Sequence, residues 1–352
     1  MTRRLYIDWL RGVAVVWMIM WHSIDSWSVT DGRDSLAFGL IAFAAGWVSP
    51  LFLFLAGVSI PLAGVARMER HGEARHAASR ALTRRGWQVF LIAHLFRFQS
   101  FLLNPNGSWS GLMKPDILNV LGLGIVAAAF CWGRASSSTR SLVMWLVVPG
   151  VVLVAILTPW ARHWWWPTLL HPRLEAYFRP VGNYGVFTLF PTMAFVFGGT
   201  FLGAMLAERR TTSEIVAHRT MAMAGLALIV VGMAFSRTPW SLAPRWSDLM
   251  SLFLCRTGVM AMAMAAAWAA FRRWPLERGN ALVVLGQTSL FVYWVHVELA
   301  YGVFSYPIRH ALTLPWAFAA FLCLTWLMLI GARFWMRHTG SGAWIPSHMK
   351  AA

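Results

Sequence analysis

The chain has 352 residues, of which 58% are hydrophobic and only 12% are charged. Soluble globular proteins have about 45–50% apolar and about 25% charged residues, so this composition excludes an ordinary water-soluble domain. Continuous apolar runs such as LVMWLVVPGVVLVAILTPW (142–160) exclude a transmembrane β-barrel, whose strands alternate apolar and polar residues. The sequence therefore predicts an all-α, polytopic membrane protein.

Ten apolar segments are candidates to cross a hydrocarbon core of about 30 Å as helices. In chain order they cover approximately residues 9–29, 35–64, 86–103, 116–133, 141–160, 184–207, 220–236, 249–271, 281–305 and 315–335. Because no internal repeat is visible, we assign residues 1–352 to a single transmembrane domain of about ten helices.

The formal net charge is +17, and most of the Lys and Arg residues fall on one predicted side of the membrane. With the N-terminus inside, 19 Lys and Arg residues fall on the cytoplasmic side and 8 on the opposite side. This asymmetry is the positive-inside bias, so both termini are predicted to be cytoplasmic and no nucleic-acid partner is expected. The three cysteines (Cys131, Cys255 and Cys323) lack metal-ligand spacing, so neither a disulfide framework nor a metal site is expected.

The first segment carries charged and titratable residues on one face. Arg11 and His22 are eleven residues apart, and eleven steps of about 100° bring them to the same side of a helix, roughly 16 Å apart along its axis. Asp8 lies three residues before Arg11, and Asp25 three after His22, which extends the stripe. Ionisable groups cost at least about 2.5–3.5 kcal/mol each inside a bilayer, so this stripe faces protein or water and marks a candidate site.

Polar residues in three other segments are predicted to lie at the same extracytoplasmic end. They are His94 and Arg97 in the third segment, Asp116 and Asn119 in the fourth, and His296 and Glu298 in the ninth. Together with His22 and Asp25 they suggest a water-accessible cavity. Arg97 requires a carboxylate, for which Asp116 and Asp25 are candidates. His296 and Glu298 are about 200° apart on a regular helix, so only one of them faces a shared site unless the helix breaks there, and His296 is favoured.

Each of these patterns also has a purely structural explanation. Asp8 and Arg11 can form an i,i+3 pair that anchors a helix end at the membrane interface. A hydrogen bond between His22 and Asp25 can simply hold two helices together. The shared stripe and the additional polar residues favour a functional role.

Several motifs resemble known membrane acyltransferases. YIDWLRGVAVVWMIMWHS (6–23), with its Arg11-to-His22 spacing, is similar to the first span of the acyltransferase-3 family. SPLFLFLAGVSIPLA (49–63), NPNG (104–107), DILNVLGLG (116–124) and LGQTSLFVYWVHVELAYG (285–302) resemble the heparan-alpha-glucosaminide N-acetyltransferase family and its bacterial relatives. The similarity extends in consistent order from about residue 4 to about residue 335.

The resemblance implies a ten- or eleven-span transferase in the bacterial inner membrane. Its co-substrate would be cytoplasmic acetyl-CoA, and its acceptor an amine or hydroxyl of an extracytoplasmic saccharide or glycolipid; a homodimer is also implied. In the lysosomal relatives the first span ends in asparagine where this chain has His22, and their proposed catalytic histidine lies in the following loop. The corresponding loop here, SWSVTDGRDS (26–35), has no histidine. Either His22 takes the role of the base, or another helix supplies it.

Acyl transfer assigns a role to each candidate residue. His22 or His296 would act as the base, with Asp25 or another carboxylate orienting the ring. Arg97, Asn119 or Gln287 would stabilise the oxyanion, and Arg97, Asp116, Asn119 and Glu298 would bind the acceptor. Arg11, with Arg80, Arg84 and Arg85 in SRALTRRGW (79–87), would bind the CoA phosphates, although positive-inside charge alone also explains these arginines.

Two other functions are compatible with the sequence. A transporter or flippase would use the polar stripe as a permeation path, but the paired, interrupted helices and repeats typical of transporters are not visible. A structural subunit would use the buried polar residues only to hold helices together, so that His22→Ala would lower the yield without a specific chemical defect.

Overall fold

The computed structural model describes residues 3–30, 33–103, 112, 114–163, 165–182, 187–208, 213–237 and 246–339. Within these ranges the chain is helical and forms no β-strand beyond an isolated bridge between Ser28 and Leu312. The predicted all-α class is confirmed. The NPNG motif (104–107) lies outside the described residues.

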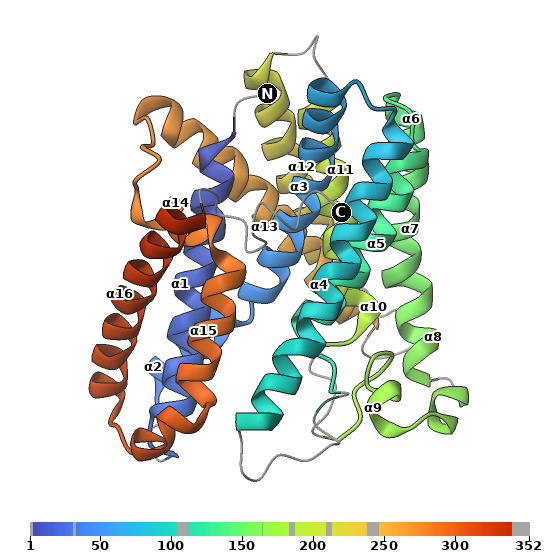
Figure 1. The fold of residues 1–352 in the computed structure, drawn as a ribbon. Coiled ribbons are helices and arrows are strands. Elements are labelled where there is room, and N and C mark those ends of the chain that lie inside the picture. Colours follow the sequence, from blue (N-terminus) through green and yellow to red (C-terminus); the bar gives the residue numbers. More distant parts are fainter. Residues whose placement is uncertain are drawn as a thin grey trace. The chain divides into compact units, whose positions relative to one another are not determined.

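Figure 1 shows the helices and their order along the chain. The longer ones are α1 (Leu5–Trp27), α2 (Leu36–Ala45), α3 (Val48–His71), α4 (Arg75–Leu103), α5 (Ile117–Arg134), α11 (Ala194–Glu208), α12 (Glu214–Arg237), α13 (Trp246–Arg273), α15 (Ser289–Tyr301) and α16 (Leu314–Thr339). The shorter ones are α6 (Thr139–Leu142), α7 (Val148–Val152), α8 (Thr158–His163), α9 (Pro172–Glu175), α10 (Leu189–Thr192) and α14 (Ala281–Gln287), with π-helical turns at Val143–Val147 and Leu153–Leu157.

Each of the ten predicted segments contains helix, and the membrane class fits the structure. Among the described residues, six helical stretches are long and apolar enough to cross a membrane, and α14 with α15 makes a seventh if that bent pair is one span. The structure thus does not confirm a count of about ten spans. The 23-residue α1 is long enough to span about 30 Å, but its polar residues set it apart from those six.

Several helix boundaries differ from the prediction. The predicted segment 35–64 contains two helices, because α2 ends at Ala45 and α3 begins at Val48. The predicted segment 86–103 begins eleven residues earlier, at Arg75. Arg80, Arg84 and Arg85, predicted to precede a span at its cytoplasmic mouth, therefore lie on α4 itself.

The predicted ninth segment is broken. α14 and α15 meet at Thr288 with a bend of 89°, an interruption that was not visible in the sequence. The hydroxyl of Thr288, 1% exposed, donates to the carbonyl oxygens of Val284 at 2.9 Å and Leu285 at 3.5 Å. The Thr288 backbone N–H also donates to the Val284 carbonyl oxygen at 3.1 Å, so Thr288 supplies both backbone and side-chain donors to the last turn of α14.

The chain folds into two compact units. Unit 1 consists of residues 50–98 and 108–266, and unit 2 of residues 2–49, 99–107 and 267–352. The assignment of a single domain remains a prediction, and each unit is described by itself.

In unit 1, glycines bring α3 close to α11. A Cβ added to Gly57 would lie 2.1 Å from the carbonyl oxygen of Val196, and one added to Gly199 would lie 2.0 Å from that of Phe54. Gly225 and Gly258 bring α12 and α13 together in the same way. Small residues of this kind let membrane helices approach backbone to backbone.

In unit 2, α1 packs against α14, α15 and α16. Figure 1 shows the blue α1 beside the orange α15 and the red α16. Gly12 of α1 faces Leu282 of α14, and Gly286 faces Asp8, with an added Cβ in either case only 1.9 Å from a carbonyl oxygen. Residue numbers rise on one helix as they fall on the other, so α14 runs opposite to α1 along this contact.

Candidate active site

The polar stripe predicted on the first span lies on one continuous helix. α1 carries Asp8, Arg11, His22 and Asp25 without a break between them. Asp8 is buried, whereas the other three are partly exposed. The two ends of the stripe contact different partners in unit 2.

The C-terminal end of α1 forms a histidine pair. His22 Nδ1 lies 2.9 Å from His296 Nε2 of α15, and the two imidazole rings are almost parallel, with 7° between their planes. His296 is completely buried, and its Nδ1 lies 2.6 Å from the carbonyl oxygen of Val292. The prediction favoured His296 over Glu298 for a shared site, and it is His296 that contacts His22.

Asp25 does not orient the His22 ring as predicted. Its carboxylate accepts a hydrogen bond from the Tyr301 hydroxyl at 2.8 Å and lies 3.5 Å from an Arg33 guanidinium nitrogen. Arg33 also donates to the Asp25 carbonyl oxygen at 2.7 Å. The Tyr301 and His22 rings make a T-shaped contact, with 5.4 Å between ring centroids. The ring nitrogen of His22 that faces a partner faces His296 instead.

Further contacts fix α15 alongside this end of α1. Ser26 Oγ donates to the Ala300 carbonyl oxygen at 2.6 Å, so both this pair and the histidine pair join residues 274 apart. Residue numbers therefore rise together, and α15 runs in the same direction as α1. Residues 310–312 add backbone hydrogen bonds to residues 26–29, which hold the end of α1 in place.

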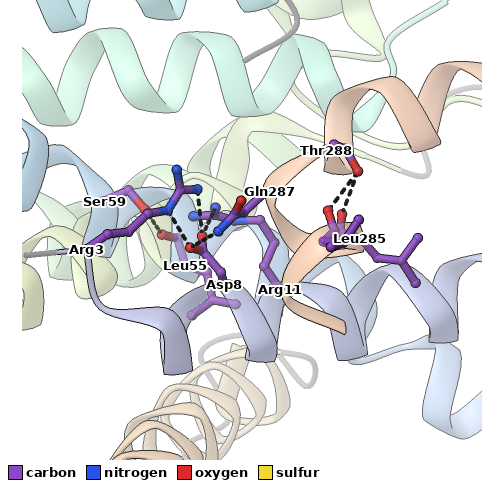
Figure 2. Close-up of polar contacts among 9 residues, drawn as sticks. Arg3, Asp8, Arg11, Leu55, Ser59, Leu285, Gln287 and Thr288 are labelled. Atoms are coloured by element: carbon purple, nitrogen blue, oxygen red, sulfur yellow. Dashed lines mark hydrogen bonds and ion pairs between the residues drawn. The ribbon is translucent and has the colours of Figure 1, made fainter. Parts of the chain in front are cut away.

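The N-terminal end of the stripe is a charged cluster. Figure 2 shows Arg3, Arg11 and Gln287 converging on Asp8. The Asp8 carboxylate accepts from Arg3 at 2.6 and 3.1 Å, from Arg11 at 3.2 Å and from the Gln287 amide at 3.2 Å. The predicted Asp8–Arg11 pair is confirmed. Gln287, one of three residues predicted as oxyanion donors, contacts Asp8 at this end of the stripe.

A second polar cluster lies in unit 1. Arg97 donates to Asp116 Oδ2 at 3.1 Å, which identifies Asp116 rather than Asp25 as its carboxylate. Asn119 Nδ2 lies 3.2 Å from His94 Nδ1, and Asn119 Oδ1 accepts from the Asp116 backbone at 2.9 Å. Asp116 also caps α5, so these residues stabilise the start of that helix as well as forming a polar site.

Tyr177 belongs to the same part of unit 1. Its burial, followed by the charge of Asp116, raises the pKa of the Tyr177 hydroxyl to about 12. The hydroxyl is therefore protonated at neutral pH and remains a hydrogen-bond donor.

The remaining predicted residues are described within their own units. Arg80 and Arg84 are exposed on α4, and Arg85 donates to Gln88 at 3.3 Å. Glu298 is partly exposed on α15, about 200° around the helix from His296. Among the described residues, no group of three or more His, Cys, Asp or Glu side chains is arranged to hold a metal ion.

Sequence reasoning missed Tyr301, Arg33 and Tyr177. Tyr301 is near the end of the predicted ninth segment, directly before Gly302, and Arg33 follows the predicted first segment. A tyrosine and an arginine near span ends are common interfacial residues, so neither carries a functional signal without its partner, Asp25. One signal was available for the helix break: Gln287, Thr288 and Ser289 form a polar triplet inside an apolar segment.

The family of this chain follows from a comparison with protein-family models. The model described as "Heparan-alpha-glucosaminide N-acetyltransferase, catalytic" matches residues 3–235, about two thirds of the chain. The chain belongs to this family. A comparison with curated proteins finds no match.

Membership in the heparan-alpha-glucosaminide N-acetyltransferase family, together with the apolar helices, indicates a membrane acetyltransferase. The matched region includes His22, Arg97 and Asn119. It ends before α13, so His296 and Tyr301 lie beyond it. The partners of His22 in the structure thus come from the part of the chain that the family model does not cover.

Proposed function

We propose that this chain transfers an acetyl group from cytoplasmic acetyl-CoA to an amine or hydroxyl of an extracytoplasmic saccharide or glycolipid. Family membership supports acetyl transfer in general. The observation that carries the finer proposal is the contact of 2.9 Å between His22 and His296. Attack of an amine or hydroxyl on a thioester requires a base near the departing proton, and imidazole is the side chain best suited to that task near neutral pH.

The other candidate residues take supporting roles in this proposal. Arg11, Arg80, Arg84 and Arg85 supply positive charge for the CoA phosphates, and Arg97, Asp116, Asn119 and Glu298 supply hydrogen bonds for the acceptor. The Lys and Arg asymmetry supports cytoplasmic termini, which would place His22 toward the outer side. Location in a bacterial inner membrane and assembly as a homodimer remain predictions.

The test uses purified protein in lipid nanodiscs with acetyl-CoA and glucosamine. We expect release of free CoA thiol together with N-acetylglucosamine, measured by a thiol reagent and by mass spectrometry. His22→Ala should lower turnover by about 10²–10⁴-fold, the usual contribution of general-base catalysis. His338→Ala is the matched control, because His338 is an exposed histidine at the end of α16.

Two outcomes would contradict the proposal. A ligand that binds the native state must stabilise it. The proposal is therefore wrong if millimolar acetyl-CoA does not raise the melting temperature of wild-type protein and the protein acetylates none of a panel of sugar amines and hydroxyls. Undiminished turnover by folded His22→Ala protein would remove His22 from the reaction. A reporter fusion that places residue 28 in the cytoplasm would exclude transfer across the membrane.

One observation favours a second candidate, a transporter or flippase. Broken helices line substrate paths in many transporters, and α14 and α15 form such a pair. In proteoliposomes loaded with labelled glucosamine, a transporter would release unmodified sugar without acetyl-CoA. An acetyltransferase would leave the sugar inside or convert it only when acetyl-CoA is present.

A further inference from the structure

The hydrogen bonds of His296 determine which of its nitrogens carries a proton. Nδ1 lies 2.6 Å from the Val292 carbonyl oxygen, one helical turn earlier. A carbonyl oxygen only accepts hydrogen bonds, so Nδ1 of His296 must donate. In a neutral imidazole only one nitrogen carries hydrogen, and Nε2 of His296 therefore presents a lone pair.

This assignment determines the protonation of His22 in turn. His22 Nδ1 lies 2.9 Å from His296 Nε2. Because His296 Nε2 has no hydrogen to give, His22 Nδ1 must be the donor. The lone pair of neutral His22 is then on Nε2, which has no hydrogen-bond partner among the residues that the structure describes.

Burial also distinguishes the two histidines, because only His22 is partly exposed. His296 is 0% exposed, and both of its nitrogens are engaged, by Val292 and by His22. His22 is partly exposed, so part of this residue is open to contact with another molecule. The carboxylate of Asp25, which could otherwise compete for His22 Nδ1, contacts Tyr301 and Arg33 instead.

We infer that His22 is the base, acting through Nε2, and that His296 is a positioning residue that fixes the tautomer and orientation of the His22 ring. This inference rests on the proposed function for the reaction itself. In this arrangement neutral His296, held by the Val292 carbonyl, orients the base. A carboxylate performs this task in a Ser-His-Asp triad. A neutral group suits a buried position, because an ionised carboxylate there would have to be desolvated.

The roles follow through the reaction. As the acceptor amine or hydroxyl attacks the thioester carbonyl carbon, its proton passes to His22 Nε2 and the new N–C or O–C bond forms. The C–S bond then breaks, and Nε2 returns the proton to the departing sulfur, which gives CoA thiol. Throughout, Nδ1–H of His22 donates to His296 Nε2, so the ring keeps the same orientation in both steps.

The tautomers are tested by ¹⁵N NMR of protein labelled at histidine, reconstituted in lipid bilayers. His22→Gln and His296→Gln identify the two sets of signals by their disappearance. We expect both residues to show hydrogen on Nδ1 and a lone pair on Nε2. A His22 signal with hydrogen on Nε2, or a His296 signal with hydrogen on Nε2, would overturn the inference. This measurement requires no enzymatic activity.

Kinetics with two variants of His296 test its role as a positioning residue. His296→Leu removes the acceptor and should lower kcat by about 10²-fold, at the lower end of the general-base range, with little change in KM for acetyl-CoA. His296→Gln places an amide oxygen near the position of Nε2 and should recover most of that loss. Equal losses in the two variants would contradict the positioning role.

The two failures are distinguishable. If wild-type protein transfers no acetyl group while both histidines show the expected tautomers, the proposed function is wrong and the hydrogen-bond assignment stands. If wild-type protein is active but His22 carries its hydrogen on Nε2, the proposed function stands and the division of roles between His22 and His296 is wrong.

Discussion

The two ends of the polar stripe on α1 contact the same broken helix, but they hold opposite kinds of polar group. At the N-terminal end, the buried Asp8 carboxylate receives hydrogen bonds from Arg3, Arg11 and Gln287. At the C-terminal end, two histidines share one hydrogen bond, and His22 keeps a nitrogen available. The first arrangement satisfies a fixed charge, and the second leaves a titratable group able to react.

The break at Thr288 makes both contacts possible. α14 runs opposite to α1 and brings Gln287 to Asp8, whereas α15 runs along α1 and brings His296 to His22. A straight helix of the same length could not meet α1 in both directions. We therefore expect Asp8 variants at the charged end to affect stability and variants at the histidine end to affect turnover.

Asp8→Ala should have the largest effect on stability. Removing one partner from a buried ion pair costs about 3–5 kcal/mol, and we expect about 3 kcal/mol here because the Arg3 side chain is 54% exposed. The measurement is chemical unfolding in detergent, with exposed Asp34→Ala as the matched control. If the comparison of the two ends is right, the folded fraction of Asp8→Ala retains most of its specific activity. A stability equal to that of wild type would show that the cluster is energetically unimportant.

Gly286→Ala should have the next largest effect. The added Cβ would lie 1.9 Å from the Asp8 carbonyl oxygen, so α14 would have to move away from α1. Overpacking of this kind costs about 1–3 kcal/mol. Gly279→Ala is the control, because a Cβ there meets nothing within 4 Å. Thermal unfolding measures the difference, and equal melting temperatures for the two variants would argue against this close packing of helices.

Tyr301→Phe should have a smaller effect. It removes the hydrogen bond of 2.8 Å to Asp25 but retains the ring against His22. The loss of one side-chain hydrogen bond costs about 0.5–1.5 kcal/mol. Because Asp25 would then be held only by Arg33 and could turn toward His22, we also expect a modest fall in kcat. An increase in kcat would indicate that Asp25 assists His22 directly, contrary to the role given to His296.

The smallest effect concerns an exposed ion pair that serves as a reference for the buried one. Arg67 donates to Glu73 at 2.7 Å, and this hydrogen bond lowers the pKa of Glu73 below its usual 4.5. Stability from this pair is present above the unfolded-state pKa and is lost as the pH falls through the lower folded-state pKa.

The measurement is the difference in melting temperature between wild-type protein and Glu73→Gln. We expect a small difference at pH 7 that disappears as Glu73 becomes protonated at acidic pH. The effect should be much smaller than that of Asp8→Ala, because water and salt screen exposed charges. A difference as large as that of Asp8→Ala would mean that burial does not distinguish the two pairs.

Local sequence patterns predicted much of α1 and part of the second cluster. The spacing of Asp8, Arg11, His22 and Asp25 placed them on one face, since helical periodicity alone determines this. The need of Arg97 for a carboxylate narrowed its partner to Asp116 or Asp25, but the choice between them required the structure. Asp116 is both the partner of Arg97 and the cap of α5, and only the second role has a local sequence signal.

The contacts that define the candidate site were harder to predict, because they join residues far apart in the chain. His22 and His296 are separated by 274 residues, and no periodicity relates them. Asp25 was expected to orient His22 because it lies three residues away, yet its carboxylate faces Tyr301. The contact of Gln287 with Asp8 joins residues 279 apart, so no local pattern predicts it either.

The sequence alone determined that this protein is a bundle of membrane helices with a polar stripe on its first span. Composition and periodicity suffice for this, because burial of apolar side chains in lipid and backbone hydrogen bonding within each helix are local requirements. Only the tertiary structure decided that His22 faces His296 rather than Asp25. That choice depends on the bend at Thr288 and on the glycine contacts between α1 and α14, which are properties of packing rather than of any one segment.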